Sequence, residues 1–159
     1  MHVLIPRTRH WVRIEPKSGD KTKEKFSWSC KVFKPEWQIG RHIHNELKMT
    51  TQQGYIGAAY EAGPFTGVKF GVLNDKQAIL PDFNFSLKQN NLLQGLVMVA
   101  CCAIPDVNNE GESLGVLSID SYTDGSENLI KNDDNLKQLI EAMDELASAL
   151  GDYLKDFKK

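Results

Sequence analysis

Cysteine is scarce in this chain, which has only three in 159 residues: Cys30, Cys101 and Cys102. Such an odd and widely spaced set makes a poor disulfide framework. Because neighbouring side chains of a strand point to opposite faces, the adjacent Cys101 and Cys102 also make a poor metal site. The simplest interpretation is that these are buried, reduced thiols of a cytoplasmic protein.

Long apolar runs are absent as well. No window approaches the roughly 18 uninterrupted apolar residues that indicate a transmembrane helix. The apolar start, Met1–Ile5, is too short for a secretory signal, and Pro6 interrupts it. We therefore expect a cytoplasmic location, with the cytosolic part of a membrane-anchored protein as the alternative.

Catalytic motifs are also missing. The sequence contains no phosphate-binding loop, nucleophile elbow or zinc knuckle. Asp106 and Asp120 have no spaced partner for general acid–base catalysis. His42 and His44 could share one face of a strand, but no third metal ligand is evident. We predict that the chain is not an enzyme, and we expect neither a cofactor nor a metal site.

Charge is unevenly distributed along a chain of ordinary composition, whose length suits a single domain over residues 1–159. Residues 1–48 carry 11 lysines and arginines against 5 acids, whereas residues 49–159 carry 8 against 16. Oppositely charged faces of one domain are the simpler explanation, and a basic edge near a membrane or a polyanion is the alternative. Glu15, Asp20 and Glu24 interrupt the basic stretch, which argues against nucleic-acid binding.

Hydropathy patterns predict most elements. Met1–Ile5 and His10–Glu15 are typical of a hairpin that turns between them, and alternation over Phe26–Val32 predicts a half-buried strand. The apolar runs Leu92–Ile104 and Leu114–Ser121 predict two buried strands joined by an exposed loop. A short helix capped by Thr50 or Thr51 is expected to end at Gly63-Pro64. Residues 74–91 are irregular, as is typical of a lid or a binding loop.

The clearest helix spans about 133–157, with Asn132 or Asp133 as its cap. Just over three heptads of apolar residues are marginal for an independent coiled coil. The stripe is wide enough to pack on its own sheet and also to pair with a second chain, so both arrangements stay open. Its members are Leu136, Leu139, Met143, Leu146, Leu150, Tyr153 and Phe157.

Three stretches together resemble the GAF family of sensory domains. Gln53–Gly63 is similar to its glycine-rich helix start and turn, Leu92–Pro105 to its central strand ending in proline, and Leu114–Ser121 to its most recognisable strand. The resemblance runs from Met1 to about Leu154. It implies an α+β, GAF/PAS-like fold: a central antiparallel sheet with helices packed on one face and a loop-covered pocket on the other. The family pattern normally begins with a helix, which we expect to be absent here or to precede Met1 in a longer protein.

The expected pocket lies among the 74–94 stretch, the preceding helix and the two buried strands. A cleft with apolar walls and a few polar groups suits a small planar ligand. Stacking on Phe83 or Phe85 would contribute about 1–3 kcal/mol if the ligand carries a nucleobase. The opposing explanation is that both phenylalanines only fill the core. The candidate ligand-binding residues are Tyr55, Asn74, Asp75, Phe83, Phe85, Gln94, Met98 and Ser118.

The resemblance implies a sensory domain that binds a small molecule, with a cyclic nucleotide among the candidates. The signature of the cyclic-nucleotide subgroup cannot be placed in full in this sequence. A homodimer is expected to pass the signal through its terminal helix to an effector outside this chain. A dimerisation or protein-interaction module without a ligand is the alternative. A thiol-dependent free methionine sulfoxide reductase is the third hypothesis, and it requires Cys30 to converge with Cys101 or Cys102.

Overall fold

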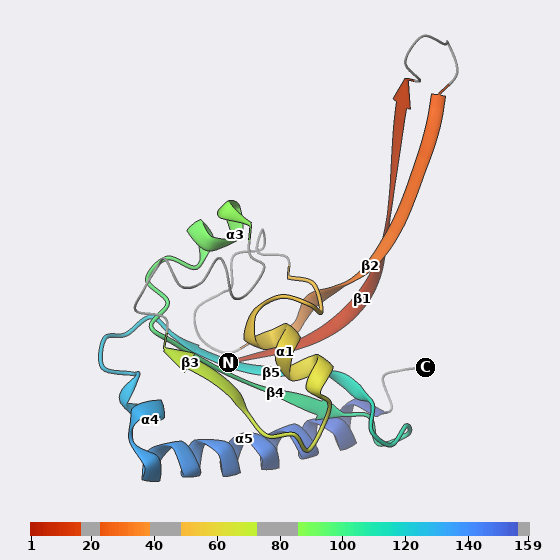
Figure 1. The fold of residues 1–159 in the computed structure, drawn as a ribbon. Coiled ribbons are helices and arrows are strands. Elements are labelled where there is room, and N and C mark those ends of the chain that lie inside the picture. Colours follow the sequence, from red (N-terminus) through yellow and green to blue (C-terminus); the bar gives the residue numbers. More distant parts are fainter. Residues whose placement is uncertain (17–22, 39–48, 73–85, 156–159) are drawn as a thin grey trace.

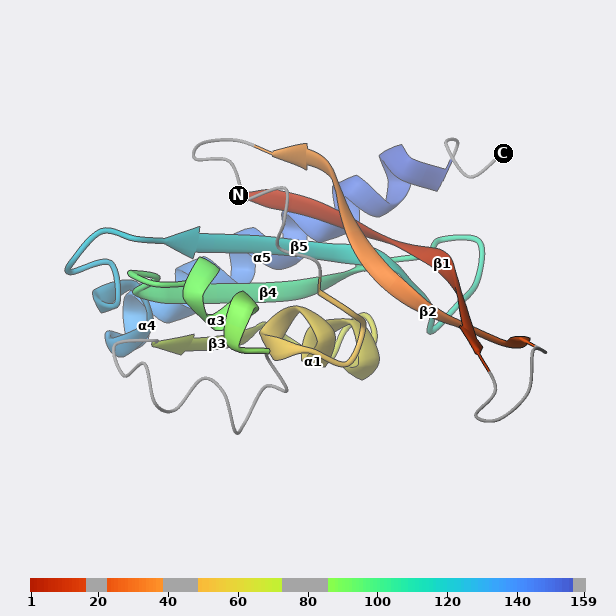
Figure 2. The same ribbon diagram turned by 90° about the horizontal axis from the view of Figure 1, so that it is seen from above.

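The computed structural model describes residues 1–16, 23–38, 49–72 and 86–155, which form a five-stranded sheet with helices on both faces (Figure 1). Every neighbouring pair of strands is antiparallel, in the order β2-β1-β5-β4-β3 (Figure 2). The predicted α+β class and antiparallel sheet are therefore confirmed. In chain order the elements are β1 (His2–Pro16), β2 (Lys23–Gln38), α1 (Gly54–Ala62), β3 (Lys69–Val72), α3 (Leu87–Leu92), β4 (Met98–Pro105), β5 (Ser113–Ser121), α4 (Asn128–Lys131) and α5 (Asp133–Leu154).

The centre of the sheet is the pair β4 and β5, which the apolar runs predicted. Every residue of β4 from Met98 to Ile104 is buried, because helices cover both of its faces. The strand is shorter than the run Leu92–Ile104 suggested. Leu92 ends α3 instead, and the next residues form a turn in which Gly95 has a positive φ of 81°.

One face of the sheet packs on α5. The buried residues Met143 and Ala147 of α5 join alternate residues of β4, from Met98 to Ile104, in one hydrophobic cluster. The helix begins at Asp133, and the side chain of Asn132 accepts a hydrogen bond of 3.0 Å from the Asn135 amide, which confirms the predicted cap. At the other end, a Cβ added to Gly151 would lie 2.7 Å from the Pro105 carbonyl oxygen, so the helix backbone lies close to the end of β4.

The opposite face, which we call the α1 face, packs on α1. Ile56 and Ala59 form a second cluster with Val99, Cys101 and Val116 of the sheet. Because α1 and α3 lie on this side and α4 and α5 on the other, the expectation of helices on one face only is wrong (Figure 1). The expected threonine cap is also wrong, since α1 begins after Gln53, whose side chain makes no capping hydrogen bond.

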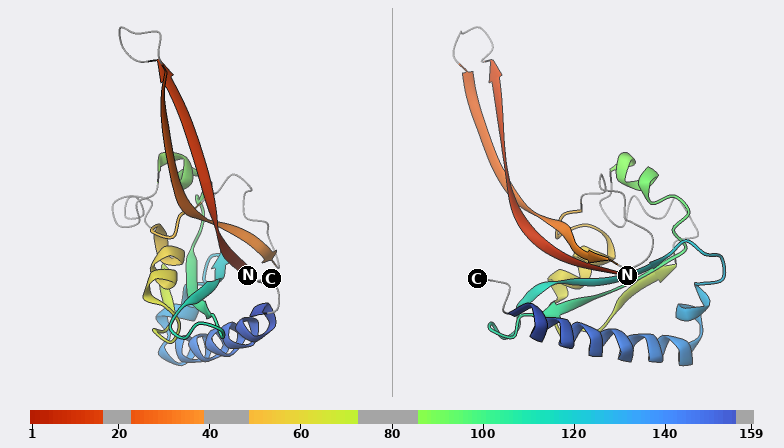
Figure 3. Two further views of the ribbon diagram at one scale, coloured as in Figure 1. Left: turned by 90° about the vertical axis from the view of Figure 1, so that its right-hand side faces the viewer. Right: turned by 180° about the vertical axis from the view of Figure 1, so that it is seen from behind.

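The N-terminal strand differs most from the sequence-based expectation. His2–Pro16 is one continuous strand, so the hairpin turn expected around Pro6–Arg9 does not exist. β1 pairs with β5 only over His2–Leu4, so after Leu4 one edge of β1 carries no strand-to-strand hydrogen bonds. Proline, which lacks a backbone N–H donor, is therefore tolerated at position 6. Beyond this point the paired residues 7–16 and 23–32 project away from the sheet (Figure 3). We call this two-stranded ribbon the arm.

Phe33 fixes the base of the arm to the domain. Its amide donates a hydrogen bond of 2.9 Å to the carbonyl oxygen of Met49. Its ring meets the ring of Tyr60 edge to face, with 5.6 Å between centroids. The arm therefore leaves the domain at an aromatic contact beside α1.

Candidate functional site

A row of chemically active side chains crosses the α1 face. The strand register sets His2 of β1 opposite Ser118 of β5, Ser118 opposite Cys101 of β4, and Cys101 opposite Lys69 of β3. Residues directly opposite each other in antiparallel strands share one face of the sheet. Asp120 lies two positions beyond Ser118 and so belongs to the same face.

His2 and Asp120 form the least satisfied part of this row. The Nε2 atom of His2 lies 2.7 Å from the Oδ1 atom of Asp120, and the two side chains are 1% and 16% exposed. Within the described residues, His2 Nδ1 is buried and has no hydrogen-bond partner, and the one printed contact of Asp120 Oδ1 is that with His2 Nε2. A buried polar group without a partner costs about 1–3 kcal/mol. The pair is therefore a place where a bound polar group would gain hydrogen bonds at once.

The thiol of Cys101 is held in its neutral form. Its Sγ donates a weak hydrogen bond of 3.4 Å to Ser118 Oγ. Burial raises the pKa of Cys101 to about 12, and the hydrogen bond with Ser118 offsets this rise only in part. Burial likewise raises the pKa of Cys102 to about 12, with Asp144 adding to the effect. Neither thiol is a thiolate at neutral pH, so neither is poised for nucleophilic attack.

The position of Cys30 argues against the reductase hypothesis. Cys30 lies on β2 opposite Arg9, whereas Cys101 lies in the row that contains His2. Arg9 lies seven positions beyond His2, which is about 23 Å along β1. Cys101 and Cys102 also point to opposite faces of the sheet, as the sequence suggested. The convergence of Cys30 with either of them is therefore not observed.

A pair of glutamines ties α3 to the start of α1. The Nε2 of Gln53 donates to Oε1 of Gln89 at 3.3 Å, and the Nε2 of Gln89 donates back to Oε1 of Gln53 at 3.0 Å. Gln89 also closes a capping box at the start of α3, where its Oε1 accepts from the Ser86 amide at 2.9 Å and its own amide donates to Ser86 Oγ at 3.2 Å. This tether holds the short helix α3 on the same side of the sheet as α1.

Two of the predicted ligand-binding residues share the α1 face. Ser118 lies in the row, and Tyr55 of α1 has its hydroxyl over Gly71 of β3, where a side chain larger than hydrogen would have no room. Gln94 is exposed in the turn before β4 and donates a hydrogen bond of 3.4 Å to Asn91 Oδ1. Asn74, Asp75, Phe83 and Phe85 lie outside the described residues.

Met98 faces the other way, contrary to the expectation that it lines a site together with Ser118. It is fully buried in the cluster beneath α5. The run from Leu96 to Ile104 is apolar at every position, so it carries no alternation from which the face of a given residue could be read. The register now assigns the even-numbered residues of β4 to α5 and the odd-numbered ones to α1.

His2, Asp120 and Cys101 were missed as members of the site. A usable signal did exist, since His2 is the one polar residue in the run Met1–Ile5, and Asp120 is the one charged residue in the run Leu114–Ser121. The contact between His2 and Asp120 depends on the pairing of β1 with β5, the first and last strands along the chain, and a single sequence does not reveal this pairing. A polar residue in each of two apolar strands is the pattern to look for.

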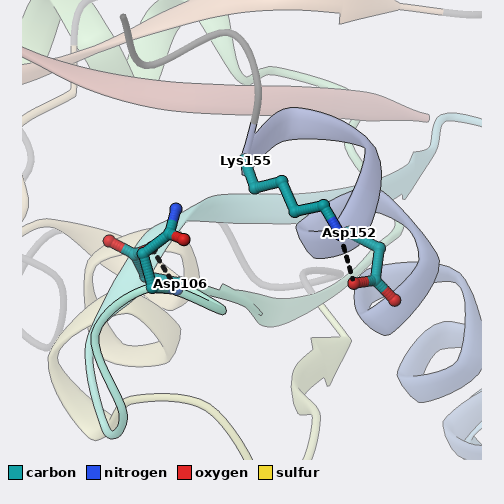
Figure 4. A network of polar contacts seen from close by, with 4 residues as sticks. Asp106, Asp152 and Lys155 are labelled. Atoms are coloured by element: carbon teal, nitrogen blue, oxygen red, sulfur yellow. Dashed lines mark hydrogen bonds and ion pairs between the residues drawn. The ribbon is translucent and has the colours of Figure 1, made fainter.

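Asp106 has a structural role. Its Oδ1 accepts a hydrogen bond of 3.1 Å from the Asn108 amide, and its Oδ2 accepts one of 2.9 Å from Asn109 Nδ2, which closes the turn between β4 and β5 (Figure 4). The exposed pair of Asp152 near the end of α5 and Lys155 just after it, 3.5 Å apart, appears in the same view. These contacts organise the surface at the end of the sheet and offer no paired catalytic groups.

Comparison with known proteins gives no relative. No protein-family model matches the chain, no curated protein matches it, and no solved structure matches it. The described part of the chain contains no cluster of three or more histidine, cysteine, aspartate or glutamate side chains that could hold a metal ion. None of the described helices is both long and apolar enough to cross a membrane.

Proposed function

We propose that this chain is a GAF-like sensory domain that binds a small polar molecule on the α1 face and does no chemistry itself. The observation that carries the proposal is the close pair of His2 and Asp120, in which the buried Nδ1 atom of His2 has no hydrogen bond among the described residues. A stable domain seldom leaves a buried polar atom unpaired without a functional reason. The raised pKa values of Cys101 and Cys102 support binding over thiol catalysis.

The chemistry of the pair favours a ligand that donates hydrogen bonds. A carboxylate oxygen can only accept, and Asp120 presents such a group beside His2. The amino and imino groups of a nucleobase offer such donors, so a nucleotide, including a cyclic one, remains our first candidate. Ser118, beside both groups in the row, would add a hydroxyl that can donate or accept.

Signal transmission is proposed to run through the sheet to α5. Alternate residues of β4 pack on α1 and on α5, so a shift of α1 changes the surface against which α5 rests. A ligand that favours one position of α1 and its tethered α3 would shift the population of α5 positions. In this proposal the chain acts as a homodimer and passes the change to an effector outside it.

A protein-interaction module without a ligand is the second candidate, and the surface of α5 favours it. On α5, a second apolar stripe lies beside the buried one. Its residues are alternately three and four positions apart, as in a coiled-coil seam. Within it, Leu146 is 36% and Tyr153 64% exposed. This stripe comprises Leu139, Ala142, Leu146, Ala149 and Tyr153.

Thermal unfolding with a ligand panel tests the sensory proposal. We expect at least one of a set of nucleobases, nucleosides, cyclic nucleotides and amino acids to raise the Tm of the wild-type protein. Asp120→Asn keeps the size of the side chain but removes its charge. This variant should bind the stabilising compound at least tenfold more weakly, so the compound should raise its Tm less than that of the wild type. Asp124→Asn, in the exposed turn after β5, is the matched control, and the compound should raise its Tm as much as that of the wild type. An unchanged Tm with every compound, or equal shifts in both variants, would contradict the site.

A further inference from the structure

The second apolar stripe of α5 has acids along its free border. α5 forms the outer layer on its side of the sheet (Figure 3). Successive residues of a helix are about 100° apart, which places the buried Met143 on one side of Leu146 and the exposed Glu145 on the other. Acids recur along that exposed side at helical spacing. We call them the acidic row, and its members are Asp134, Glu141, Glu145 and Asp152.

The few basic residues of the helix leave the acidic row negative. Lys137 lies 4.0 Å from Glu141, and Lys155 lies 3.5 Å from Asp152. Both pairs are exposed, and such pairs contribute only about 0–1 kcal/mol. Glu145, at the middle of the row, has no ion pair among the described residues. A partner that packs on the stripe therefore meets an acidic border.

This border argues against a second copy of the chain as the partner. Antiparallel helices that pair through such a seam bring the same flanking positions of both helices together. The other border of the stripe, at Met143 and Leu150, packs on the sheet, so only the acidic row is free to flank a partner. Two copies would then set Glu145 and Asp152 against the same acids of the other copy. The row would likewise repel the anionic surface of a membrane.

We propose that the second stripe of α5 binds an amphipathic helix of another protein, with lysines or arginines beside its apolar face. Large side chains and alanines alternate along the stripe, so Ala142 and Ala149 leave room for large apolar side chains of the partner helix. The basic residues of the partner would face the acidic row. This partner is the effector that the proposed function requires, and in that respect the inference rests on it.

The length of the stripe predicts a transient complex. From Leu139 to Tyr153 the helix rises by about 21 Å, at 1.5 Å per residue. A contact between two helices over this length is small compared with a permanent interface. We therefore expect dissociation constants in the micromolar range, which suits an effector that binds and leaves.

A pair of synthetic peptides tests the chemistry of the partner. Both have three heptads with leucine at positions a and d, and they differ only in carrying lysine or glutamate at positions e and g. Like charges at these positions keep each peptide from pairing with itself. Fluorescence anisotropy with the full chain should show that the lysine peptide binds at least tenfold more tightly than the glutamate peptide. Equal binding of the two, or no binding up to about 100 μM, would overturn the proposal.

Two substitutions at neighbouring positions separate docking on the stripe from general attraction to an acidic protein. Glu145→Lys and Asp144→Lys change the net charge equally, but Asp144 lies on the side of the helix away from the stripe. Glu145→Lys should bind the lysine peptide at least fivefold more weakly, and Asp144→Lys should bind it as the wild type does. Leu146→Gln, with its cooperative unfolding retained, should weaken binding at least tenfold. Equal losses in Glu145→Lys and Asp144→Lys would overturn the proposal.

Further measurements distinguish the other occupants and the ligand site. A wild-type dimer in sedimentation that Leu146→Gln abolishes would assign the stripe to a second copy. Binding to vesicles of phosphatidylserine and phosphatidylcholine that Leu146→Gln abolishes would assign it to a membrane, and either result would overturn the proposal. Asp120→Asn leaves α5 unchanged and should bind the lysine peptide as the wild type does. Failure of peptide binding while ligands still raise the Tm would therefore contradict this partner alone.

Discussion

The side chains on the α1 face differ in how they tolerate burial. The Cys101 thiol stays protonated, and it donates a hydrogen bond of 3.4 Å to Ser118 Oγ. His2 is buried beside them, and its Nδ1 atom has no hydrogen bond among the described residues. A protein can retain such a cost at a binding site, because the same atoms become favourable when a ligand supplies the missing hydrogen bonds.

The two buried thiols predict a dependence of stability on high pH. Their pKa values of about 12 in the folded protein lie above the ordinary value of 9.0, so the unfolded chain loses these protons first as pH rises. Stability that is complete below pH 9 should then fall between pH 9 and 12, by up to about 1.4 kcal/mol per pH unit for each thiol. Urea unfolding across this range measures the slope.

Cys101→Ala/Cys102→Ala removes both ionisable groups and serves as the comparison. Its free energy of unfolding should be lower at pH 8 because two buried side chains are truncated. Its decline from pH 9 to 11 should nevertheless be shallower than that of the wild type. Parallel curves for the two proteins would show that these thiols do not carry the dependence.

At the scale of elements, α5 rests on the sheet along its small residues. Ala147 and Gly151 are buried one turn apart, and the close approach of Gly151 to Pro105 fixes the end of the helix against β4. The first part of the predicted stripe, including Met143, packs on the sheet, whereas Leu146 and Tyr153 stay exposed. The heptad spacing left two arrangements open, packing on the sheet and pairing with a second chain. Each of them has its own set of residues on α5.

Gly151→Ala tests this close approach. Alanine favours a helix by about 1 kcal/mol over glycine, so propensity alone predicts a more stable protein. The added methyl group would lie 2.7 Å from the Pro105 carbonyl oxygen, and the resulting shift should cost about 1–3 kcal/mol. We expect net destabilisation in urea unfolding. Ser148→Ala, on the exposed side of the same helix, should be neutral or slightly stabilising, and a stabilised Gly151→Ala would contradict the tight contact.

The elements with strong local signals were predicted from the sequence, and those that depend on distant pairing were not. An apolar run identified β5 and a capping residue identified the start of α5, because both signals are properties of neighbouring residues. The extent of β1 was missed because Pro6 is a turn signal locally, and only its place on a free edge makes it compatible with a strand. For the candidate site, Tyr55 and Ser118 lie on the α1 face, whereas Met98 lies on the other face, because its apolar run has no alternation that fixes which face a residue occupies.

At the scale of the whole molecule, the domain and the arm have separate sources of stability. Both hydrophobic clusters are built from the sheet and from α1, α4 and α5, and Phe33 is the β2 residue in the cluster on the α1 face. The arm beyond Phe33 adds backbone pairing to β1 and β2 alone among the described elements. The domain should then fold without the arm, whereas the arm depends on the domain for its base.

Removing the arm provides the test of this division. Pro6 and Phe33 face each other in the register, so replacing residues 7–32 by Asn-Gly leaves a position where a two-residue hairpin turn can join the strands. We expect the shortened protein to unfold cooperatively, with a Tm within a few degrees of that of the full-length protein. The same ligands should still raise its Tm, because His2, Asp120 and α1 are retained. A shortened chain without cooperative unfolding would mean that the arm is part of the folding unit.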